Sequence, residues 1–225
     1  MQTGADDGRQ IKVSAFRWVP PFAQGVVRDM RVRWALEEAG VAYSARLLDV
    51  GENKSSDYRQ LQPFGQVPVY EDGELVLFES GAIVLHIAER SPALMPEDAE
   101  GRARTRMWIF AALNTLEPSV QNLAELDLFN ASETWAKLRR PGVVAAVRTR
   151  LADLAASLGD SDYLEGRFTA GDLMMTTVLQ ILRHTELVEE FPALAAYRRR
   201  CEARPAFKKA LADHMAPFAA NAPKA

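Results

Sequence analysis

The chain has 225 residues, of which 48% are hydrophobic and 25% charged, with 27 basic and 30 acidic side chains and a formal charge of −3. This composition supports a substantial core and excludes wholesale disorder, and the near balance of charge gives no electrostatic basis for nucleic-acid binding. A single cysteine excludes an internal disulfide framework, and no apolar run approaches the roughly 20 residues of a membrane helix. The polar first ten residues lack a signal-peptide core and are expected to be frayed, so we expect a cytoplasmic protein.

The first ninety residues predict a small mixed α/β unit. Alternation of apolar and polar residues over 11–16 predicts a strand. Helical spacing of Val27, Met30 and Trp34 then predicts a helix that ends at Gly40. Residues 41–50 are expected to form a second strand and residues 54–61 a short helix. Two strands that flank a helix favour a right-handed parallel crossover.

A hairpin is the clearest local signal in the chain. Residues 67–71 and 74–78 are expected to be strands, because Asp72-Gly73 between them is a preferred two-residue turn. Ser80 is predicted to be the N-cap of a helix over residues 80–88.

Beyond a linker at residues 91–98, every periodic segment is helical. Pro118 is expected to kink or end the first of these helices, and residues 144–158 carry the strongest amphipathic pattern. Thr169 and Asp172 form a predicted capping box. Helices are expected around residues 194–200 and 206–213, with a loose tail from Pro217. The order predicts an α/β unit followed by an all-α unit.

One constellation combines groups that suit a peptide-like ligand with an amino-acid head. A cis bond before Pro68 would free the backbone N–H and C=O of Val67 for an extended peptide. Ser80 places a hydroxyl and a helix N-terminus at one point, which suits a carboxylate. Glu79 beside it can hold an ammonium group. Each feature alone is more often structural, and only their combination favours a binding site.

These residues resemble the glutathione S-transferase family, specifically its bacterial cytosolic type. The matching segments are LQPFGQVP at 61–68, LFESGAI at 77–83 and FTAGD at 168–172. The resemblance implies a thioredoxin-like glutathione-binding domain over residues 10–91 and an all-helical domain over residues 98–218. It also implies glutathione as a co-substrate and assembly as a homodimer.

The resemblance assigns roles to particular residues. The cysteinyl part of glutathione would lie against the Val67-Pro68 turn and the γ-glutamyl head against Glu79 and Ser80. The glycyl carboxylate would lie near the loop after the second strand. The glutathione-binding residues that the resemblance implies are Gln66, Val67, Pro68, Glu79, Ser80, Asn53 and Lys54. Phe64 resembles the aromatic key that enters the partner subunit in several classes. Ordinary local packing of Phe64 is an equally good alternative.

The expected thiol-activating residue is missing. Members of the family activate the glutathione thiol with a Tyr, Ser or Cys in or just after the first strand, whereas this chain carries Val19 before Pro20, and Ser14 lies inside the strand. Three alternatives follow. The thiolate could be held by backbone N–H groups near Val19, with help from Arg17 or Trp18, or by a donor from the helical unit such as Asn114 or Arg106. In the third alternative, the protein binds glutathione without rapid chemistry.

The function predicted is conjugation of the glutathione thiolate to a hydrophobic electrophile. The electrophile pocket is expected between the two units, with walls from Trp18, Phe22, Trp108 and Ala111. The alternatives are a glutathione-dependent peroxidase or disulfide reductase, and a non-catalytic glutathione- or ligand-binding protein.

The remaining reactive side chains have structural interpretations. Cys201 lies at helical spacing from apolar residues and is expected to be a buried core thiol. The three histidines have no metal-ligand spacing, so no metal site is expected, and His86 is expected to be packed or solvated. The basic runs, including Arg31 and Arg33, are predicted to be solvated helix faces.

Overall fold

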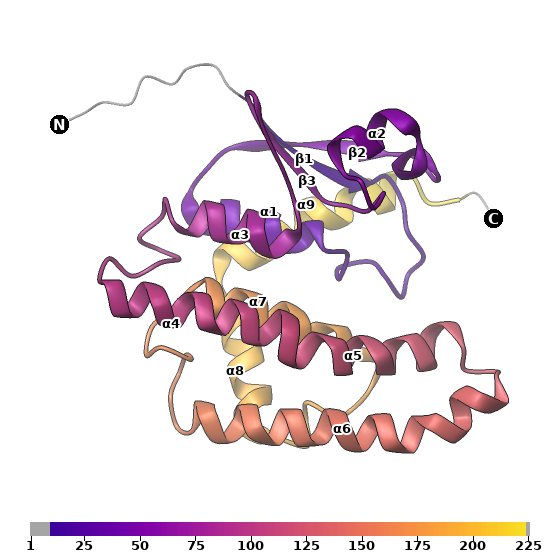
Figure 1. The fold of residues 1–225 in the computed structure, drawn as a ribbon, viewed down its shortest axis with the longest axis vertical. Helices are drawn as coiled ribbons and strands as arrows, with labels where there is room; N and C mark the ends of the chain where they lie inside the picture. Colours follow the sequence, from indigo (N-terminus) through magenta and orange to yellow (C-terminus); the bar gives the residue numbers. More distant parts are fainter. Residues whose placement is uncertain (1–9, 224–225) are drawn as a thin grey trace.

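A computed structural model describes residues 10–223, so nine of the ten residues predicted to be frayed lie outside the described part. Four strands form one mixed sheet in the order β2-β1-β3-β4 (Figure 1). β1 pairs in parallel with β2, while β3 is antiparallel to both β1 and β4. Their bounds are Ile11–Phe16 (β1), Tyr43–Leu48 (β2), Val69–Asp72 (β3) and Leu75–Phe78 (β4). The parallel crossover and the hairpin are therefore confirmed, but Asp72 pairs with Leu75, so the two turn residues are Gly73-Glu74 and not Asp72-Gly73.

Three α-helices accompany the sheet: α1 (Asp29–Ala39), α2 (Ser56–Leu61) and α3 (Ser80–Ala88), with a 3₁₀ turn, η1, at Glu52–Lys54. α1 connects the two parallel strands and ends at Gly40, whose φ of 67° is left-handed, as predicted. Its flank turned toward the C-terminal part carries Trp34, whose ring lies 5.6 Å from Phe168 and 4.9 Å from Phe207. The core is thus continuous between the mixed sheet unit and the helices that follow it.

The rest of the described chain is helical. Figure 1 shows α4, α5 and α6 on the side away from the sheet, while α9 returns to lie beside α1. The elements are α4 (Ala99–Phe110), η2 (Ala111–Leu116), α5 (Glu117–Ala124), η3 (Glu125–Phe129), α6 (Thr134–Leu158), α7 (Ala170–Leu179), η4 (Gln180–His184), α8 (Pro192–Glu202) and α9 (Pro205–Ala220). All ten residues of α7 are buried, so α7 is the central helix of this part. Among the described residues, no helix combines the length and apolar character needed to cross a bilayer.

The predicted capping box anchors α7. Asp172 Oδ2 accepts a hydrogen bond from the Thr169 backbone N–H at 2.9 Å, and Thr169 Oγ1 accepts one from Gly171 N–H at 3.2 Å. Asp172 Oδ1 also accepts from the Tyr197 hydroxyl at 3.0 Å and from Leu164 N–H at 2.9 Å. The box therefore fixes α8 and the loop before α7 as well as the helix start.

Pro118, Pro141 and Pro217 all lie within helices of the structure. Pro118 lies in the first turn of α5, which follows the π-helical stretch η2 directly, so the helical segment does not end at this proline. Helix α6 begins ten residues before the predicted 144 and passes through Pro141. The tail predicted from Pro217 is also wrong, because α9 runs to Ala220 and buries Phe218 against the ring of His214.

A buried polar cluster joins α1 to α9. Asp29 Oδ2 accepts from Arg33 Nε at 2.8 Å and lies 3.1 Å from His214 Nδ1, and all three side chains are buried. The prediction that Arg33 lies on a solvated helix face is therefore wrong. Its charge is compensated by Asp29 one turn earlier, and a histidine 185 positions from that aspartate contacts the same carboxylate oxygen.

Candidate functional site

A tight turn precedes β3 and begins the site. The Val67–Pro68 peptide bond is cis, as expected, and β3 begins at Val69, so Val67 lies outside the strand ladder. Tyr58 supports the turn, because its hydroxyl donates to the Gln66 carbonyl at 2.8 Å and contacts Ser14 Oγ at 2.7 Å. Ser14 Oγ in turn accepts from the Val69 backbone N–H. The Ser14 hydroxyl is therefore a buried structural group.

Two polar side chains flank this turn. Asn53 Nδ2 and Lys54 Nζ both donate to the Gly65 carbonyl, at 2.7 and 2.9 Å. Gly65 has φ of 62°, and its backbone is packed so closely that a Cβ there would lie 2.6 Å from the Asn53 carbonyl oxygen. The structure thus brings the weaker candidates Asn53 and Lys54 next to Gln66 and Val67.

Glu79 and Ser80 lie at the start of α3, but their roles in capping differ from the prediction. Glu79 is the N-cap, in a left-handed conformation with φ of 69°, and makes no side-chain cap hydrogen bond. The turn at Glu79 places Ser80 inside the first helical turn, where it is 4% exposed. Its hydroxyl accepts from Arg31 Nη1 at 3.2 Å. A left-handed residue other than glycine costs free energy and is typical of functional sites.

Arg31 is a site residue that the sequence prediction missed. Only 4% of its side chain is exposed, and Nη2 lies 3.1 Å from Glu117 Oε1. Arg28 donates to the same oxygen through Nη2 at 2.7 Å and Nε at 3.1 Å. Burial tends to raise the pKa of Glu117, but the two guanidinium groups outweigh it and lower the pKa below its usual value. The solvated position predicted for Arg31 is wrong because a carboxylate 86 residues later compensates its charge.

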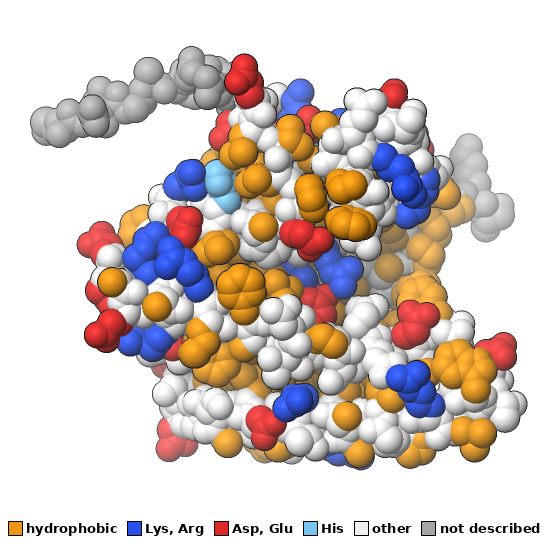
Figure 2. Space-filling view, in the orientation of Figure 1, with side chains coloured by type: hydrophobic (Ala, Val, Ile, Leu, Met, Phe, Trp, Pro, Cys, Tyr) orange, Lys and Arg blue, Asp and Glu red, His pale blue; other side chains and the backbone are white. Residues whose placement is uncertain are grey.

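Two cavities meet at these residues. A cavity of about 390 Å³ lies over Glu79 and Ser80, and a cavity of about 800 Å³ lies beside the Val67 turn. Four residues line both cavities: Arg28, Arg31, Gln66 and Gln121. Figure 2 shows a hollow between the sheet unit and the helices below it, with basic and acidic side chains inside. A polar compartment therefore lies next to a larger one.

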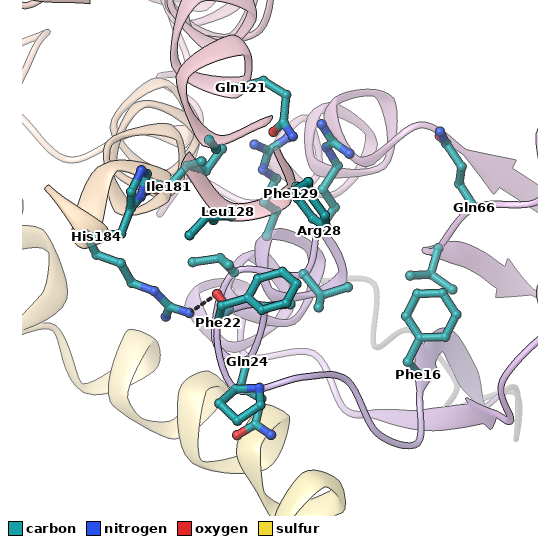
Figure 3. A pocket seen from close by; sticks show the side chains of 18 of the residues that line it. Phe16, Phe22, Gln24, Arg28, Gln66, Gln121, Leu128, Phe129, Ile181 and His184 are labelled. Atoms are coloured by element: carbon teal, nitrogen blue, oxygen red, sulfur yellow. Dashed lines mark hydrogen bonds between the residues drawn. The ribbon is translucent and has the colours of Figure 1, made fainter. Parts of the chain in front are cut away.

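The larger cavity has an apolar wall built by both parts of the chain. Phe22 and Phe129 pack edge to face with ring centroids 5.2 Å apart, and Leu128 and Ile181 line the same cavity (Figure 3). Phe22 was predicted to line the electrophile pocket. Phe129, Leu128 and Ile181 were missed, because nothing in a helical pattern distinguishes a cavity-facing residue from a core residue.

The structure places the other three residues predicted for the electrophile pocket elsewhere. Trp18, Trp108 and Ala111 do not line either cavity. Trp108 instead donates from its indole N–H to Glu165 at 2.9 Å and packs on Gly171 of α7. Trp108 and Ala111 lie in α4 and at the start of η2, and the same helical segment lines the large cavity only later, at Gln121 and Ala124.

The predicted thiol-activating groups are also separated. Arg17 Nε donates to Asp49 at 2.6 Å, and Arg106 Nη2 donates to Glu89 at 2.6 Å. Val19 is buried, and its carbonyl accepts from Gln24. Asn114 lines the smaller cavity, whereas neither Arg17 nor Arg106 lines either of the two.

Phe64, Cys201 and His86 line neither of the two cavities. Phe64 is 61% exposed, with its ring centroid 6.1 Å from that of Phe78. Cys201 is fully buried, which confirms the core thiol, and burial raises its pKa to about 12. His86 packs edge to face with Tyr70. Within residues 10–223, no three His, Cys, Asp or Glu side chains cluster as metal ligands would.

This combination defines a class of protein. The sheet unit has a thioredoxin-like order of elements, a mostly helical part follows, and a polar cavity over the start of α3 meets an apolar cavity between the parts. Residues 23–89 match the family model "Glutathione S-transferase, N-terminal domain".

Comparisons over the whole chain agree with that match. Glutathione S-transferase 4 of Zea mays is 32% identical, covering 94% of this chain and 96% of the relative. A theta class glutathione S-transferase from Xanthomonas axonopodis pv. citri, crystallised with glutathione bound, is 28% identical with a TM-score of 0.75, covering 90% of this chain and 97% of its own. Glutathione transferase F7 of Populus trichocarpa has a TM-score of 0.76 at 25% identity, covering 91% and 99% of the two chains. The chain belongs to the glutathione S-transferase family.

Proposed function

We propose that the protein is a glutathione transferase that conjugates the glutathione thiolate to a hydrophobic electrophile. The observation that supports it best is the junction of two cavities, one polar and one with an apolar wall, that share four lining residues. One charged end of a tripeptide suits the polar cavity, and its central thiol, next to Val67, would then face the apolar wall of the larger cavity.

Glutathione is the ligand that we place across the two cavities, with its γ-glutamyl end in the polar compartment and its other two residues along the Val67 edge of the larger cavity. Its γ-glutamyl carboxylate would accept from Ser80 and from Arg31, which is already directed at the Ser80 hydroxyl, and its ammonium group would pair with Glu79. The cysteinyl backbone would lie against Val67, within the glutathione-binding turn Gln66-Val67-Pro68. Lys54, together with Asn53, would receive the glycyl carboxylate. Because both charged ends of glutathione are held by the protein, the thiol between them has a fixed position.

We propose Arg28 as the group that stabilises the thiolate. A thiol with a pKa of about 8.5 is mostly protonated at neutral pH, and a nearby cation favours the thiolate. Arg28 lines both cavities, and its side chain remains 45% exposed. The backbone near Val19, with Arg17 or Trp18, was the alternative predicted from the sequence. Arg17 lines neither cavity, which favours Arg28.

The chemistry proposed is a nucleophilic substitution or addition. The thiol proton passes to water, and the sulfur electron pair forms a C–S bond to the electrophilic carbon. In a substitution the leaving group departs with its bonding pair, and in an addition the π bond opens and its electron pair takes up a proton from water. The apolar wall at Phe22 and Phe129 would hold the body of the electrophile. Binding both reactants at one junction supplies the orientation that the reaction needs.

A non-catalytic glutathione carrier is the second candidate, and Val19 is the observation that favours it, because it offers no hydroxyl where relatives activate the thiol. A glutathione-dependent peroxidase or disulfide reductase would use the same bound thiolate. Titration calorimetry with glutathione, followed by turnover of 1-chloro-2,4-dinitrobenzene, separates these functions. Binding with turnover supports the transferase, binding without turnover of this electrophile supports the carrier or the reductase, and no binding rejects all of them.

We further propose a homodimer, a cytoplasmic location and the bacterial cytosolic subtype. Exposed apolar side chains on the edge strand β4 and its neighbourhood support the dimer, with Phe64 as the entering aromatic side chain: Phe64, Leu75, Val76 and Phe78. The cytoplasm holds the reduced glutathione that the reaction consumes. The Xanthomonas neighbour supports the subtype, whereas the Zea mays relative is a plant protein. The proposed domains remain residues 10–91 and 98–218.

A further inference from the structure

The larger cavity carries positive charge without matching acidic residues in its lining. Its described lining contains no aspartate or glutamate but five basic side chains: Arg28, Arg31, Lys54, Arg183 and His184. The chain as a whole has a formal charge of −3, so this wall differs from the average surface. A concave wall of one charge sign raises the local concentration of ligands of the opposite sign.

Four of these five groups already have partners. Arg28 and Arg31 share Glu117, and Lys54 donates to the Gly65 carbonyl. His184 Nε2 lies 3.4 Å from Asp127 Oδ2. These four therefore either serve the proposed glutathione compartment or are paired with an acidic side chain behind the wall.

Arg183 is different. Within residues 10–223, no carboxylate oxygen lies within the 4 Å of a salt bridge to its guanidinium, and its Nη2 donates to the Phe22 carbonyl at 2.7 Å, the dashed line in Figure 3. Burial of part of the side chain lowers its pKa, with no acidic neighbour to oppose the effect. The residue as a whole is exposed, so an anion can reach its guanidinium without displacing a carboxylate of the described chain.

The guanidinium is held against the loop between β1 and α1. Gly25 lies beneath it with φ of 85°, and a Cβ at Gly25 would be 3.1 Å from Arg183 Nη1. The hydrogen bond to Phe22 fixes the group from the same loop. One of its five N–H donors is thus used, and an immobilised guanidinium loses less entropy when it forms a paired bond to a carboxylate.

Apolar side chains lie next to this cation. Phe22 supplies both the carbonyl that holds Arg183 and the ring that packs on Phe129. In Figure 3, Ile181 and His184 lie on the opposite side of the cavity from Phe16 and Gln66. Arg183 therefore lies beside the apolar wall, on the side of the cavity away from the Gln66-Val67-Pro68 turn.

We propose that the electrophiles of this protein are amphipathic organic acids, with an aromatic or aliphatic body on the Phe22–Phe129 wall and a carboxylate or sulfonate on Arg183. The inference rests on the proposed transferase function and specifies its substrate class. The reactive carbon lies at the end of the substrate that faces the cavity junction, and the acid group lies at the other end. Arg183 is a specificity-determining residue that takes no part in bond making.

A matched pair of electrophiles tests the proposal: 4-chloro-3-nitrobenzoate and 4-chloro-3-nitrobenzamide. In both, the thiolate forms a C–S bond at the chlorine-bearing carbon, chloride leaves with its electron pair, and the thiol proton goes to water. The pair differs in the charge of one substituent. Turnover is measured with glutathione, and equilibrium binding is measured with S-methylglutathione, which fills the glutathione site without a reactive thiol.

The variants are Arg183→Gln, Arg183→Lys and the control Arg139→Gln. Arg139 is an exposed arginine of α6 that lines neither cavity, so its replacement removes the same charge elsewhere. The original protein is expected to bind the benzoate about tenfold more tightly than the benzamide. That ratio should fall to about one in Arg183→Gln, keep a part of its value in Arg183→Lys, which retains the cation, and persist in Arg139→Gln.

Three results would overturn the proposal. They are a benzoate-to-benzamide ratio near one in the original protein, a ratio that Arg183→Gln leaves unchanged, and displacement of the benzoate by S-methylglutathione. The last result would place the acid in the glutathione compartment, at Arg31 or Lys54. An Arg183-dependent preference in a protein that also fails to turn over 1-chloro-2,4-dinitrobenzene would instead reject the transferase function and support the anion site.

Discussion

Glu117 joins the two parts of the chain through a buried charge network, and its replacement by glutamine should be strongly destabilising. Its Oε1 faces Arg28 at 2.7 Å and Arg31 at 3.1 Å, and only 8% of the Glu117 side chain is exposed. Glu117→Gln keeps the shape and one acceptor oxygen but leaves the buried guanidinium of Arg31 without a counter-charge.

The expected loss follows from burial. Breaking a buried ion pair costs about 3–5 kcal/mol, and the retained amide oxygen places Glu117→Gln near the lower end, at about 3 kcal/mol. The lost ion pair with the half-exposed Arg28 adds less than about 1 kcal/mol to this loss of stability. For a chain of this size, 1 kcal/mol shifts Tm by about 2–4 °C, so we expect Tm to fall by about 6–12 °C.

Glu89→Gln is the matched control. Glu89 also accepts a charged bond from an arginine, Arg106, at 2.6 Å, but 33% and 39% of these two side chains are exposed. The control should cost no more than about 1 kcal/mol. Thermal and urea unfolding, followed by circular dichroism without glutathione, measure both variants. A loss for Glu117→Gln no larger than that for Glu89→Gln would refute the buried-pair reasoning.

The same pair predicts a pH dependence. Burial opposes ionisation of Glu117, but Arg31 and Arg28 prevail and hold its pKa below the ordinary 4.5. A lowered folded-state pKa contributes stability that is present above pH 4.5 and is lost as pH falls through the folded pKa. The difference in unfolding midpoint between the original protein and Glu117→Gln should therefore narrow as pH decreases below 4.5. A constant difference would contradict the lowered pKa.

Three further predictions test the site, the thiol and the α7 start. Ser80→Ala should weaken glutathione binding by about 1–3 kcal/mol in calorimetry, because a charged ligand loses a hydrogen bond, while Ser157→Ala on exposed α6 should leave the affinity unchanged. Cys201 should resist a disulfide reagent in the folded protein and react fully in urea, since its pKa is raised to about 12; rapid reaction of the folded protein would contradict its burial. Asp172→Ala removes several buried hydrogen bonds and should cost about 3 kcal/mol or more in urea unfolding, with a loss below about 1 kcal/mol counting against the capping box.

Local signals in the sequence predicted much of the fold. The hairpin at Gly73, the helix end at Gly40 and the Thr169 capping box each encode their geometry within a few residues and are confirmed, except that the hairpin turn is Gly73-Glu74, one position later than predicted. Such signals depend on backbone conformation and on side-chain-to-backbone bonds that are local by nature. α6 was less predictable because Pro141 is exposed and its breaking signal is outweighed by burial on both sides of it.

The site was predictable only where its residues form sequence motifs. The Val67 turn and the Glu79-Ser80 helix start lie at the cavities as expected. Arg31 was misplaced because its counter-charge, Glu117, comes from the other part of the chain. Arg183 has no motif either, and its meaning depends on the absence of an acidic neighbour among the described residues, which only the three-dimensional structure shows.

The ionisation of bound glutathione tests the central proposal most directly. The ultraviolet absorbance of the thiolate is titrated against pH in the complex with the original protein, with Arg28→Gln as the comparison. We expect the bound thiol to have a pKa at least about one unit below the ordinary 8.5, and Arg28→Gln to reverse most of that decrease. A pKa of the bound thiol at or above that of free glutathione would contradict thiolate activation at this site.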